Sequence, residues 1–265
     1  MTRSLIVQIF KTEIADMTAF PVPFWVWRFR QLLQLVISVS LWQSVFLATS
    51  SAFGYEESRM LNYIILSSVI SYVVMASKST GLSETVHSGD LATHLLRPVS
   101  ILKIYFIRDL ADKVLNIMFA LGEIALVVWL FQIQFEIPSI EALPLLIPSL
   151  FLSVVMYFFL NVLFGTIGFW SPDVWAPRFL FYTFMFLSSG YLFPIDIFPE
   201  PVFRVISLLP FPYLLYFPTQ VLQGSLNTPA IIQGYIMTGV WCLIIGGLAF
   251  AFWNKGLRGY GSEGR

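Results

Sequence analysis

The chain has 265 residues, of which 57% are hydrophobic and 11% are charged, and its formal net charge at pH 7 is zero. Soluble globular domains carry about 25% charged residues, so this composition excludes an ordinary soluble domain and predicts an integral membrane protein. The balanced charge argues against a nucleic acid as partner, because proteins that bind nucleic acids present a basic surface. No polar stretch is long enough for a second globular domain, so we expect one transmembrane domain over residues 1–265.

Residues 4–17 have the pattern of an amphipathic helix. Apolar residues such as Leu5 fall on one helical face, and polar residues such as Lys11 fall on the opposite face. A helix of this kind lies in the membrane surface with its apolar face in the lipid. We therefore expect an N-terminal interfacial helix, which Pro21 and Pro23 should end because proline cannot continue a helix.

Six apolar segments follow, and each except the fifth has roughly the 20 residues that a helix needs to cross a hydrocarbon core of about 30 Å. The sequence therefore predicts an all-α integral membrane protein with six transmembrane helices. Spans one and two lie within residues 31–77, spans three to five within 114–193, and span six at 230–253. The individual spans are expected at 31–53, 60–77, 114–134, 143–169, 178–193 and 230–253.

The basic residues predict the orientation of these spans. Of the 15 Lys and Arg residues, only Arg59 and Arg204 fall in segments on the side opposite the N-terminus. Lys and Arg accumulate in cytoplasmic segments of membrane proteins. We therefore expect both termini in the cytoplasm, including the tail at 254–265.

The longest polar stretch, residues 78–113, lies between the second and third predicted spans. Its many charged residues predict a cytosolic loop exposed to water, and loops longer than about 15 residues are usually functional. Within it, Ser88 is expected to cap the start of a short helix, with Asp90 near the positive end of the helix dipole. Pro98 should then end this helix.

Residues 194–229, between the fifth and sixth spans, are apolar but rich in proline. Because a straight span does not tolerate so many prolines, we expect two short helices, near 200–208 and 213–223, that enter the outer leaflet and return. Irregular backbone at membrane depth survives only where protein buries it or where it lines a wet cavity. We therefore predict an extracytoplasmic re-entrant hairpin that closes the pathway, with gate residues Pro194, Asp196, Pro199 and Tyr213.

Polar side chains inside predicted spans are candidates for a transport pathway. They are Gln34, Ser38 and Gln43 on the first span and Glu123 on the third. An acid inside the membrane is costly and often functional, but Glu123 could equally turn toward a neighbouring helix. The polar residues of the first span could instead hold helices together through hydrogen bonds.

The sequence contains no catalytic or nucleotide-binding motif that we recognise. Lys78, Ser79 and Thr80 resemble the end of a phosphate-binding loop, but the glycines that should precede them are missing. His87 and His94 have no third ligand at suitable spacing, so a metal site is not expected. We therefore predict that the chain is not an enzyme and binds no cofactor of its own.

Two stretches together resemble the permease subunits of type-2 ABC transporters, the ABC-2 exporter class. They are GDLATHLLRPVS…YFIRDLADK within residues 89–113 and FPIDIFPEPVFRVISLLPFPYLLYFPTQVLQG at 193–224. The segment GLRGYGSEG at 256–264 is similar to a Gly-Leu-Arg-x-Tyr tail that is common in one bacterial branch. In segment order the resemblance covers nearly the whole chain. It departs from the family at residues 20–27, before the first span, and at Gly259, where a second basic residue is usual.

This resemblance implies a multi-pass protein of the cell inner (plasma) membrane that forms a dimer with a second copy or with a homologous permease. Two separate ABC ATP-binding subunits would bind ATP and Mg²⁺ and drive it. In that class, the loop after the second span carries a coupling helix that contacts the ATPase. Carried over, this segment is residues 84–97. Its interface residues would be Glu84, His87, Asp90, His94 and Arg97.

Three alternatives to an ATP-driven exporter stay open at this point. A secondary, proton-coupled transporter would use Glu123 as a relay, but inverted repeats are expected there and none is evident. A membrane enzyme acting on lipids would need convergent catalytic groups. A permease used for sensing or immunity cannot be separated from an exporter by sequence. The substrate is likewise not identified, although an aromatic and apolar pathway favours an amphipathic or lipid-linked molecule.

Overall fold

The computed structural model describes residues 2–19, 21–171 and 173–261. In these residues the regular structure is helical, apart from two short strands, β1 (Ser51–Ala52) and β2 (Tyr55–Glu56), which pair antiparallel. The predicted all-α class is therefore confirmed.

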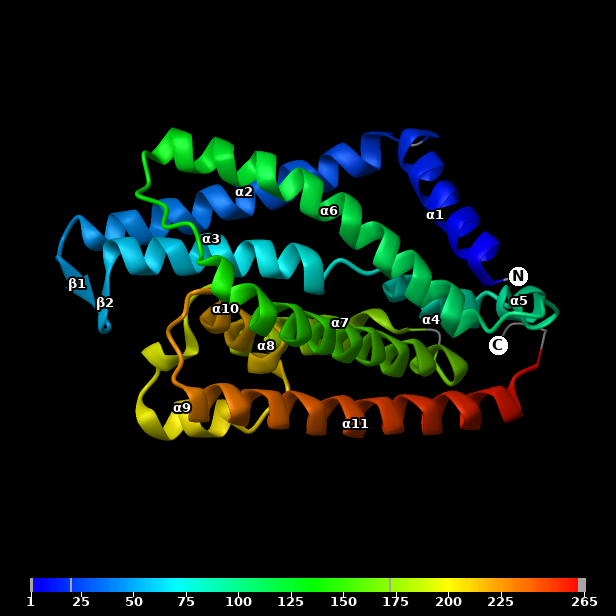
Figure 1. Ribbon diagram of the computed structural model, residues 1–265. Helices are drawn as coiled ribbons and strands as arrows, with labels where there is room; N and C mark the ends of the chain where they lie inside the picture. Colours follow the sequence, from blue (N-terminus) through cyan, green and yellow to red (C-terminus); the bar gives the residue numbers. More distant parts are fainter. Residues whose placement is uncertain (1, 20, 172, 262–265) are drawn as a thin grey trace.

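Most of the long helices run between the two ends of an elongated bundle (Figure 1). The loop end carries α4 (Leu82–His87) and α5 (Leu91–Leu95), and the turn end carries β1, β2 and α9 (Glu200–Ser207). The start of α1 (Thr2–Ala19) and the end of α11 (Thr228–Gly259) both lie at the loop end.

The first long helix starts earlier than the sequence predicts. Helix α1 covers the predicted segment 4–17, although the side chain of Leu5 lies outside the described residues. Helix α2 spans Pro21–Phe46, so the helix that contains the predicted first span begins ten residues before residue 31. Prolines fit in the first turn of a helix because the N–H groups there have no intrahelical acceptor. Pro21 and Pro23 thus separate two helices and begin the second one.

The predicted polar loop, residues 78–113, contains two short helices and the start of a long one. After α3 (Glu57–Val74), the chain forms a 3₁₀ turn, η1 (Lys78–Gly81), followed by α4 and α5. Helix α6 then spans Ile101–Phe131, so residues 101–113 of the predicted loop belong to this helix. Gly89 lies between α4 and α5 with φ of 87°, a left-handed conformation that glycine adopts without steric cost. The expectation of one continuous helix over 84–97 is therefore wrong, because the segment is divided between α4 and α5.

The next two helices differ greatly in length. A 3₁₀ turn, η2 (Ile140–Ala142), leads into α7 (Leu143–Gly165), which continues as η3 (Thr166–Phe169), in good agreement with the predicted span at 143–169. Helix α8 (Trp175–Ser188) has 14 residues, which is about 21 Å long. It begins and ends earlier than the predicted span at 178–193.

The proline-rich segment folds into two short helices, as the sequence predicts. After η4 (Ile195–Ile197), α9 is followed by η5 (Phe211–Tyr213) and by α10 (Tyr216–Leu222). The axis bends by 74° between α9 and the stretch from Phe211 to Leu222. Helix α11 then begins after Asn227, whose side chain accepts a hydrogen bond from the Ala230 N–H, and it continues beyond the predicted end at residue 253.

Among the described residues, three helical stretches are long and apolar enough to cross a membrane: Ile101–Phe131, Ile140–Phe169 and Thr228–Gly259. Two bent pairs raise this number to five if each pair is one span: Glu57–Val74 with Lys78–His87, and Glu200–Ser207 with Phe211–Leu222. Helix α2 is absent from this set although it has 26 residues, because its arginines and glutamines lower its hydropathy. The structure therefore shows a multi-pass helical protein, and six spans remain a prediction.

The buried side chains form three apolar clusters that follow the bundle from end to end. The cluster at the loop end includes Leu82 and Leu91, which are fully buried against α6, α7 and α11. The polar loop is thus part of the packed structure. By contrast, α2, α6 and α11 leave large apolar side chains such as Leu243 exposed, as expected for surfaces that face lipid.

Candidate functional site

The loop between α3 and α6, residues 78–100, is held in place by a buried carboxylate on α6. Asp109 is only 1% exposed. Its Oδ1 accepts hydrogen bonds from the backbone N–H groups of Lys78 and Ser79, at 2.7 and 3.1 Å. Its Oδ2 accepts from the hydroxyls of Ser77 and Ser79, at 2.7 and 2.9 Å. Since hydrogen bonds to an ionised group are the strong ones, Asp109 fixes the start of the loop.

Two further charges of α6 hold the end of α3. The buried Lys113 Nζ donates to the carbonyl oxygens of Val74 and Ala76, where a helix leaves acceptors unpaired. Asp112 lies 3.7 Å from the ammonium of Lys78. The sequence-based expectation that Asp112 and Lys113 face water is wrong, because both are buried and contact the end of α3 or the start of the loop.

On its other side, the loop rests against α8 and η3. Arg178 of α8 donates from Nη1 to the Thr80 carbonyl at 2.6 Å and from Nη2 to the Ser83 hydroxyl at 2.9 Å. In η3, a Cβ added to Gly168 would lie 2.5 Å from the Ser83 carbonyl oxygen, so the two backbones are in close contact. The loop is therefore rigidly positioned between α6, α7 and α8.

The opposite face of the loop is exposed. Glu84, Asp90 and Arg97 are exposed, as the interface prediction requires, whereas His87 and His94 are half-buried and lie on separate helices. Partial burial, with Arg97 and Arg108 nearby, lowers the pKa of His94 and favours its neutral form.

Ser88 does not cap the second helix, contrary to the sequence-based expectation. It follows α4, and its hydroxyl donates to the Asp90 carboxylate at 2.7 Å.

Two leucines of the loop are also exposed to solvent: Leu95 at 50% and Leu96 at 88%. This surface therefore combines charges with apolar side chains that nothing in the described chain covers.

Glu123 lies in an ion pair between α2 and α6. Its Oε1 is 2.6 Å from Nη2 of Arg28, and the two side chains are 12% and 3% exposed. Nη1 of Arg28 also donates to Asn116 and Gln31, at 3.0 and 2.9 Å. The guanidinium lies over the ring of Tyr72 at 5.5 Å. Glu123 therefore joins two helices, which does not favour a role as proton relay.

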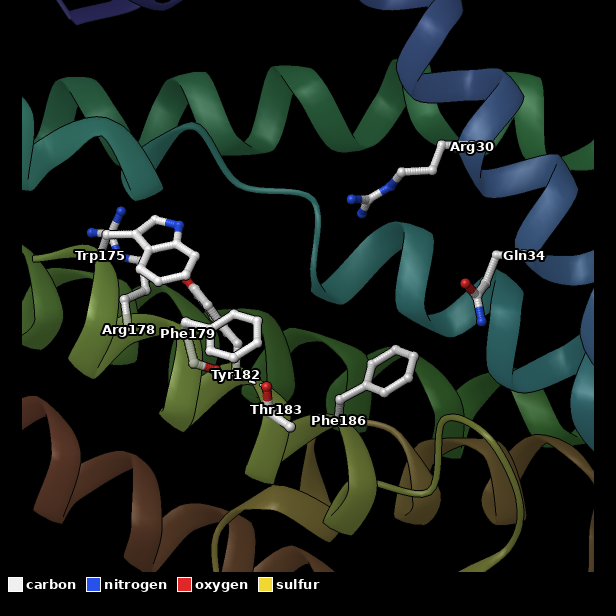
Figure 2. A pocket seen from close by; sticks show the side chains of 8 residues that line it. All are labelled: Arg30, Gln34, Trp175, Arg178, Phe179, Tyr182, Thr183 and Phe186. Atoms are coloured by element: carbon white, nitrogen blue, oxygen red, sulfur yellow. Dashed lines mark hydrogen bonds between the residues drawn. The ribbon is translucent and has the colours of Figure 1, made fainter.

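A cavity opens between α2 and α8 near the loop end. Its outer part has a volume of about 490 Å³, and a connected inner part of about 410 Å³ reaches α3 and α7. Figure 2 shows Arg30 and Gln34 extending from α2 toward Trp175, Tyr182 and Phe186 of α8.

Of the predicted pathway residues, Gln34 lines both parts of this cavity. Ser38, Gln43 and Glu123 are not among the residues that line it. The amide of Gln43 instead donates to the Phe131 carbonyl of α6 at 3.4 Å.

The predicted gate residues lie at the turn end. The hydroxyl of Tyr55 in β2 donates to the Asp196 carboxylate, at 2.8 and 2.9 Å, and accepts from Gln220 of α10 at 3.4 Å. Burial, followed by the charge of Asp196, raises the pKa of Tyr55 and keeps its hydroxyl protonated. The guanidinium of Arg59 lies 5.5 Å from the Tyr55 ring. These contacts tie the β1–β2 turn to the proline-rich segment.

The remaining gate residues shape the same segment. Pro194 and Pro199 immediately precede η4 and α9, respectively. The Tyr213 hydroxyl donates to the Ser207 carbonyl at 2.7 Å, and the Tyr213 carbonyl accepts from Ser153 of α7 at 2.7 Å. These two hydrogen bonds join η5 to the end of α9 and fix the segment to α7.

Residues 32–264 match the family model described as ABC-2 family transporter protein. The chain belongs to this family. A search of curated proteins found no match. As a member of the ABC-2 family, the chain is the membrane component of a transporter and is not itself catalytic. Proteins of this family generally act with ABC ATP-binding subunits.

Several residues that hold the loop 78–100 in place were not predicted from the sequence. Asp109, Lys113 and Arg178 position the loop, yet in the sequence they belong to a polar stretch or to the end of a span. Arg28 and Glu123 offered a usable signal, because opposite charges within membrane segments are expected to pair. The partners of Asp109 offered none, since three of its four hydrogen bonds come from residues 78 and 79, about 30 positions earlier.

Proposed function

We propose that this chain is the membrane-spanning subunit of an ATP-driven exporter. It crosses the inner membrane six times, with both termini in the cytoplasm, and forms the pathway as a dimer with a second copy or a homologous permease. Separate ATP-binding subunits bind ATP and Mg²⁺ and supply the work. The family assignment supports the permease role, and the common position of the start of α1 and the end of α11 is what an even number of crossings requires.

The observation that carries this proposal is the structure of residues 78–100. The segment is fixed on its inner side by Asp109 and Arg178 and presents Glu84, Asp90 and Leu96 on its outer side. A loop that only connects two spans does not need this degree of fixation. A segment that transmits force needs both a rigid base and a free face. We therefore assign the coupling role to the two-helix unit α4–α5, in place of the single helix expected from the sequence.

The mechanism follows from these contacts. Closure of the ATP-binding subunits around nucleotide displaces α4–α5, and Asp109 and Arg178 pass the displacement to α6 and α8. Helix α6 is long and apolar enough to cross the membrane, and α8 forms one wall of the cavity. At the turn end, the segment 194–229 closes the pathway toward the outside. The transition is a population shift between two packings that the partner binds differently.

The test uses two leucines that are equally exposed at opposite ends of the bundle. Leu96 and Leu47 are both 88% exposed. Burying a leucine at an interface contributes about 1.5–3 kcal/mol, so Leu96→Asp should weaken binding of the ATP-binding subunit by roughly 10- to 150-fold. Leu47→Asp is the matched control and should leave binding unchanged. The affinity-purified wild-type protein should carry a nucleotide-hydrolysing subunit. The ATPase activity that co-purifies should be equally high with the wild type and Leu47→Asp, and lower with Leu96→Asp.

Two results would count against the coupling role. One is retention of the ATP-binding subunit by Leu96→Asp with unchanged affinity. The other is equal loss of the subunit in Leu47→Asp. The melting temperature of each variant serves as the control for unfolding. Neither substitution should change it, because both side chains are exposed in the folded chain.

A further inference from the structure

The residues that line the cavity between α2 and α8 give it a positive charge. Two guanidinium groups, those of Arg30 and Arg178, line it, and no Asp, Glu or Lys is among the residues that line either part. We propose that this cavity binds an amphiphile with an anionic head, a phosphate or a carboxylate, and an apolar or aromatic body. The inference deepens the proposed transport function and rests on it where the ligand is taken to be cargo.

The two arginines are available to an anion in different ways. Arg30 is exposed and, among the described residues, has neither a hydrogen bond nor an ion pair, although its side chain extends into the space between the helices (Figure 2). Arg178 uses Nη1 and Nη2 for the loop, but its Nε is buried without a partner. The charge of Arg178 therefore attracts an anion into the cavity, while the free guanidinium of Arg30 can bind it. Guanidinium groups bind phosphate and carboxylate oxygens through paired hydrogen bonds.

The other lining residues suit an apolar body. Trp175 and Phe179 are stacked with ring centroids 5.2 Å apart and planes inclined by 11°. Together with Tyr182 and Phe186, they form the α8 wall of the outer part. The inner part adds aromatic rings from α2, α3 and α7. Each part falls within the range of about 300–1,000 Å³ that ligand pockets occupy, and such pockets combine apolar walls with a few placed polar groups.

Arg178 connects this cavity to the coupling segment. The same side chain borders the cavity and donates to Thr80 and Ser83 of the loop. An anion in the cavity attracts the guanidinium that fixes the start of the loop, so binding in the cavity and docking on the loop are linked. By reciprocity, each changes the affinity of the other by the same factor. The proposed ligand therefore binds at a point that links the cavity to the α4–α5 segment.

The experiment measures ligand retention by the purified full chain in a neutral detergent, by native mass spectrometry, without any ATP-binding subunit. The probes are dodecyl phosphate, dodecylphosphocholine, inorganic phosphate, phosphatidylglycerol and phosphatidylcholine. We expect a saturable complex with dodecyl phosphate or phosphatidylglycerol that is about 10- to 100-fold weaker in Arg30→Gln, because a hydrogen-bonded charge is lost. Arg30→Lys should fall between the two. Arg258→Gln, an exposed arginine on α11, is the matched control and should bind as the wild type.

The outcomes separate the possibilities. Preference for phosphatidylglycerol identifies a bilayer lipid as the source, and preference for dodecyl phosphate identifies a single-chain amphiphile; both support the proposal. Equal binding of dodecylphosphocholine, equal binding by Arg30→Gln, or inorganic phosphate binding as tightly as dodecyl phosphate would overturn it. Because no ATP-binding subunit is present, failure here leaves the coupling test with Leu96→Asp unaffected, and failure there leaves this binding test intact.

Discussion

Replacing Asp109 tests whether the coupling segment must be rigid. Asp109→Ala removes the acceptor of four hydrogen bonds at the start of the loop, two from backbone N–H groups and two from hydroxyls. The hydroxyls can turn to other acceptors, and the Ser79 N–H keeps the Ser77 hydroxyl oxygen at 3.2 Å. The N–H of Lys78 has no such second acceptor among the described contacts. We therefore expect the loop to open locally while the long helices stay folded.

The magnitude follows from the one donor that is left without an acceptor. An unpaired N–H costs about 1–3 kcal/mol, and part of this is offset because the variant no longer buries a carboxylate. We expect a net loss of about 1–2 kcal/mol in the local stability of the loop. This loss corresponds to an opening equilibrium that is roughly 5- to 30-fold larger.

Asp109→Asn is the matched control. Both backbone N–H groups donate to Oδ1, which an asparagine carbonyl can replace. The new amide group would face the hydroxyls of Ser77 and Ser79, and a hydroxyl can accept as well as donate. The asparagine variant should therefore lose less than half of what the alanine variant loses.

The assay is hydrogen exchange of residues 77–87 followed by mass spectrometry, together with binding of the ATP-binding subunit. Asp109→Ala should exchange faster in this segment and bind the subunit more weakly, whereas Asp109→Asn should stay close to the wild type. If the alanine variant shows wild-type exchange in this segment, the buried carboxylate does not hold the loop, and the argument from rigidity fails.

Three further predictions concern other parts of the molecule. Gly168→Ala places a Cβ within 2.5 Å of a backbone oxygen of α4 and should destabilise the protein by about 1–3 kcal/mol, seen as a lower melting temperature and weaker subunit binding. Arg28→Gln or Glu123→Gln leaves a buried charge unpaired and should cost about 3–5 kcal/mol, whereas the double variant should recover part of that loss in a thermal double-mutant cycle. Tyr55→Phe removes the hydroxyl that binds Asp196 and should cost about 0.5–1.5 kcal/mol, with faster exchange at the turn end only.

Each of these has a result that contradicts it. Gly247→Ala, where an added Cβ meets nothing within 4 Å, is the control for the first and should be neutral or slightly stabilising; equal loss in both glycine variants would refute the close-contact argument. Additive losses in the double variant would show that Arg28 and Glu123 are not coupled. Faster exchange at the loop end in Tyr55→Phe would contradict a local role for the tyrosine.

The long apolar elements could be predicted well from the sequence. The predicted span at 143–169 coincides with α7 and η3, and the predicted helices of the proline-rich segment lie close to α9 and α10. In these stretches one physical signal acts alone: continuous hydropathy, or prolines that stop a helix. Where a single local signal determines the structure, the sequence of that segment is enough to predict its helices.

Errors arose where a local signal had two physical outcomes. The prolines at 21 and 23 were expected to end a helix, but α2 starts at Pro21 because proline also fits the first turn of a helix. Charges such as Asp109 and Lys113 suggested a hydrated loop, but in the structure they are buried because they pair with the unpaired backbone groups at the end of α3 and the start of η1. The partners of these charges lie far away in sequence, so no local pattern could reveal them.

The most direct test of the coupling role is a site-specific photo-crosslink from the exposed tip of the loop. A photoreactive amino acid placed at Leu96 should form a covalent adduct with an ATP-binding subunit, and the yield should change when ATP is added. The same amino acid at Leu47, equally exposed at the other end of the bundle, should give no such adduct. An adduct from Leu47, or none from Leu96 in a complex that hydrolyses ATP, would contradict the account.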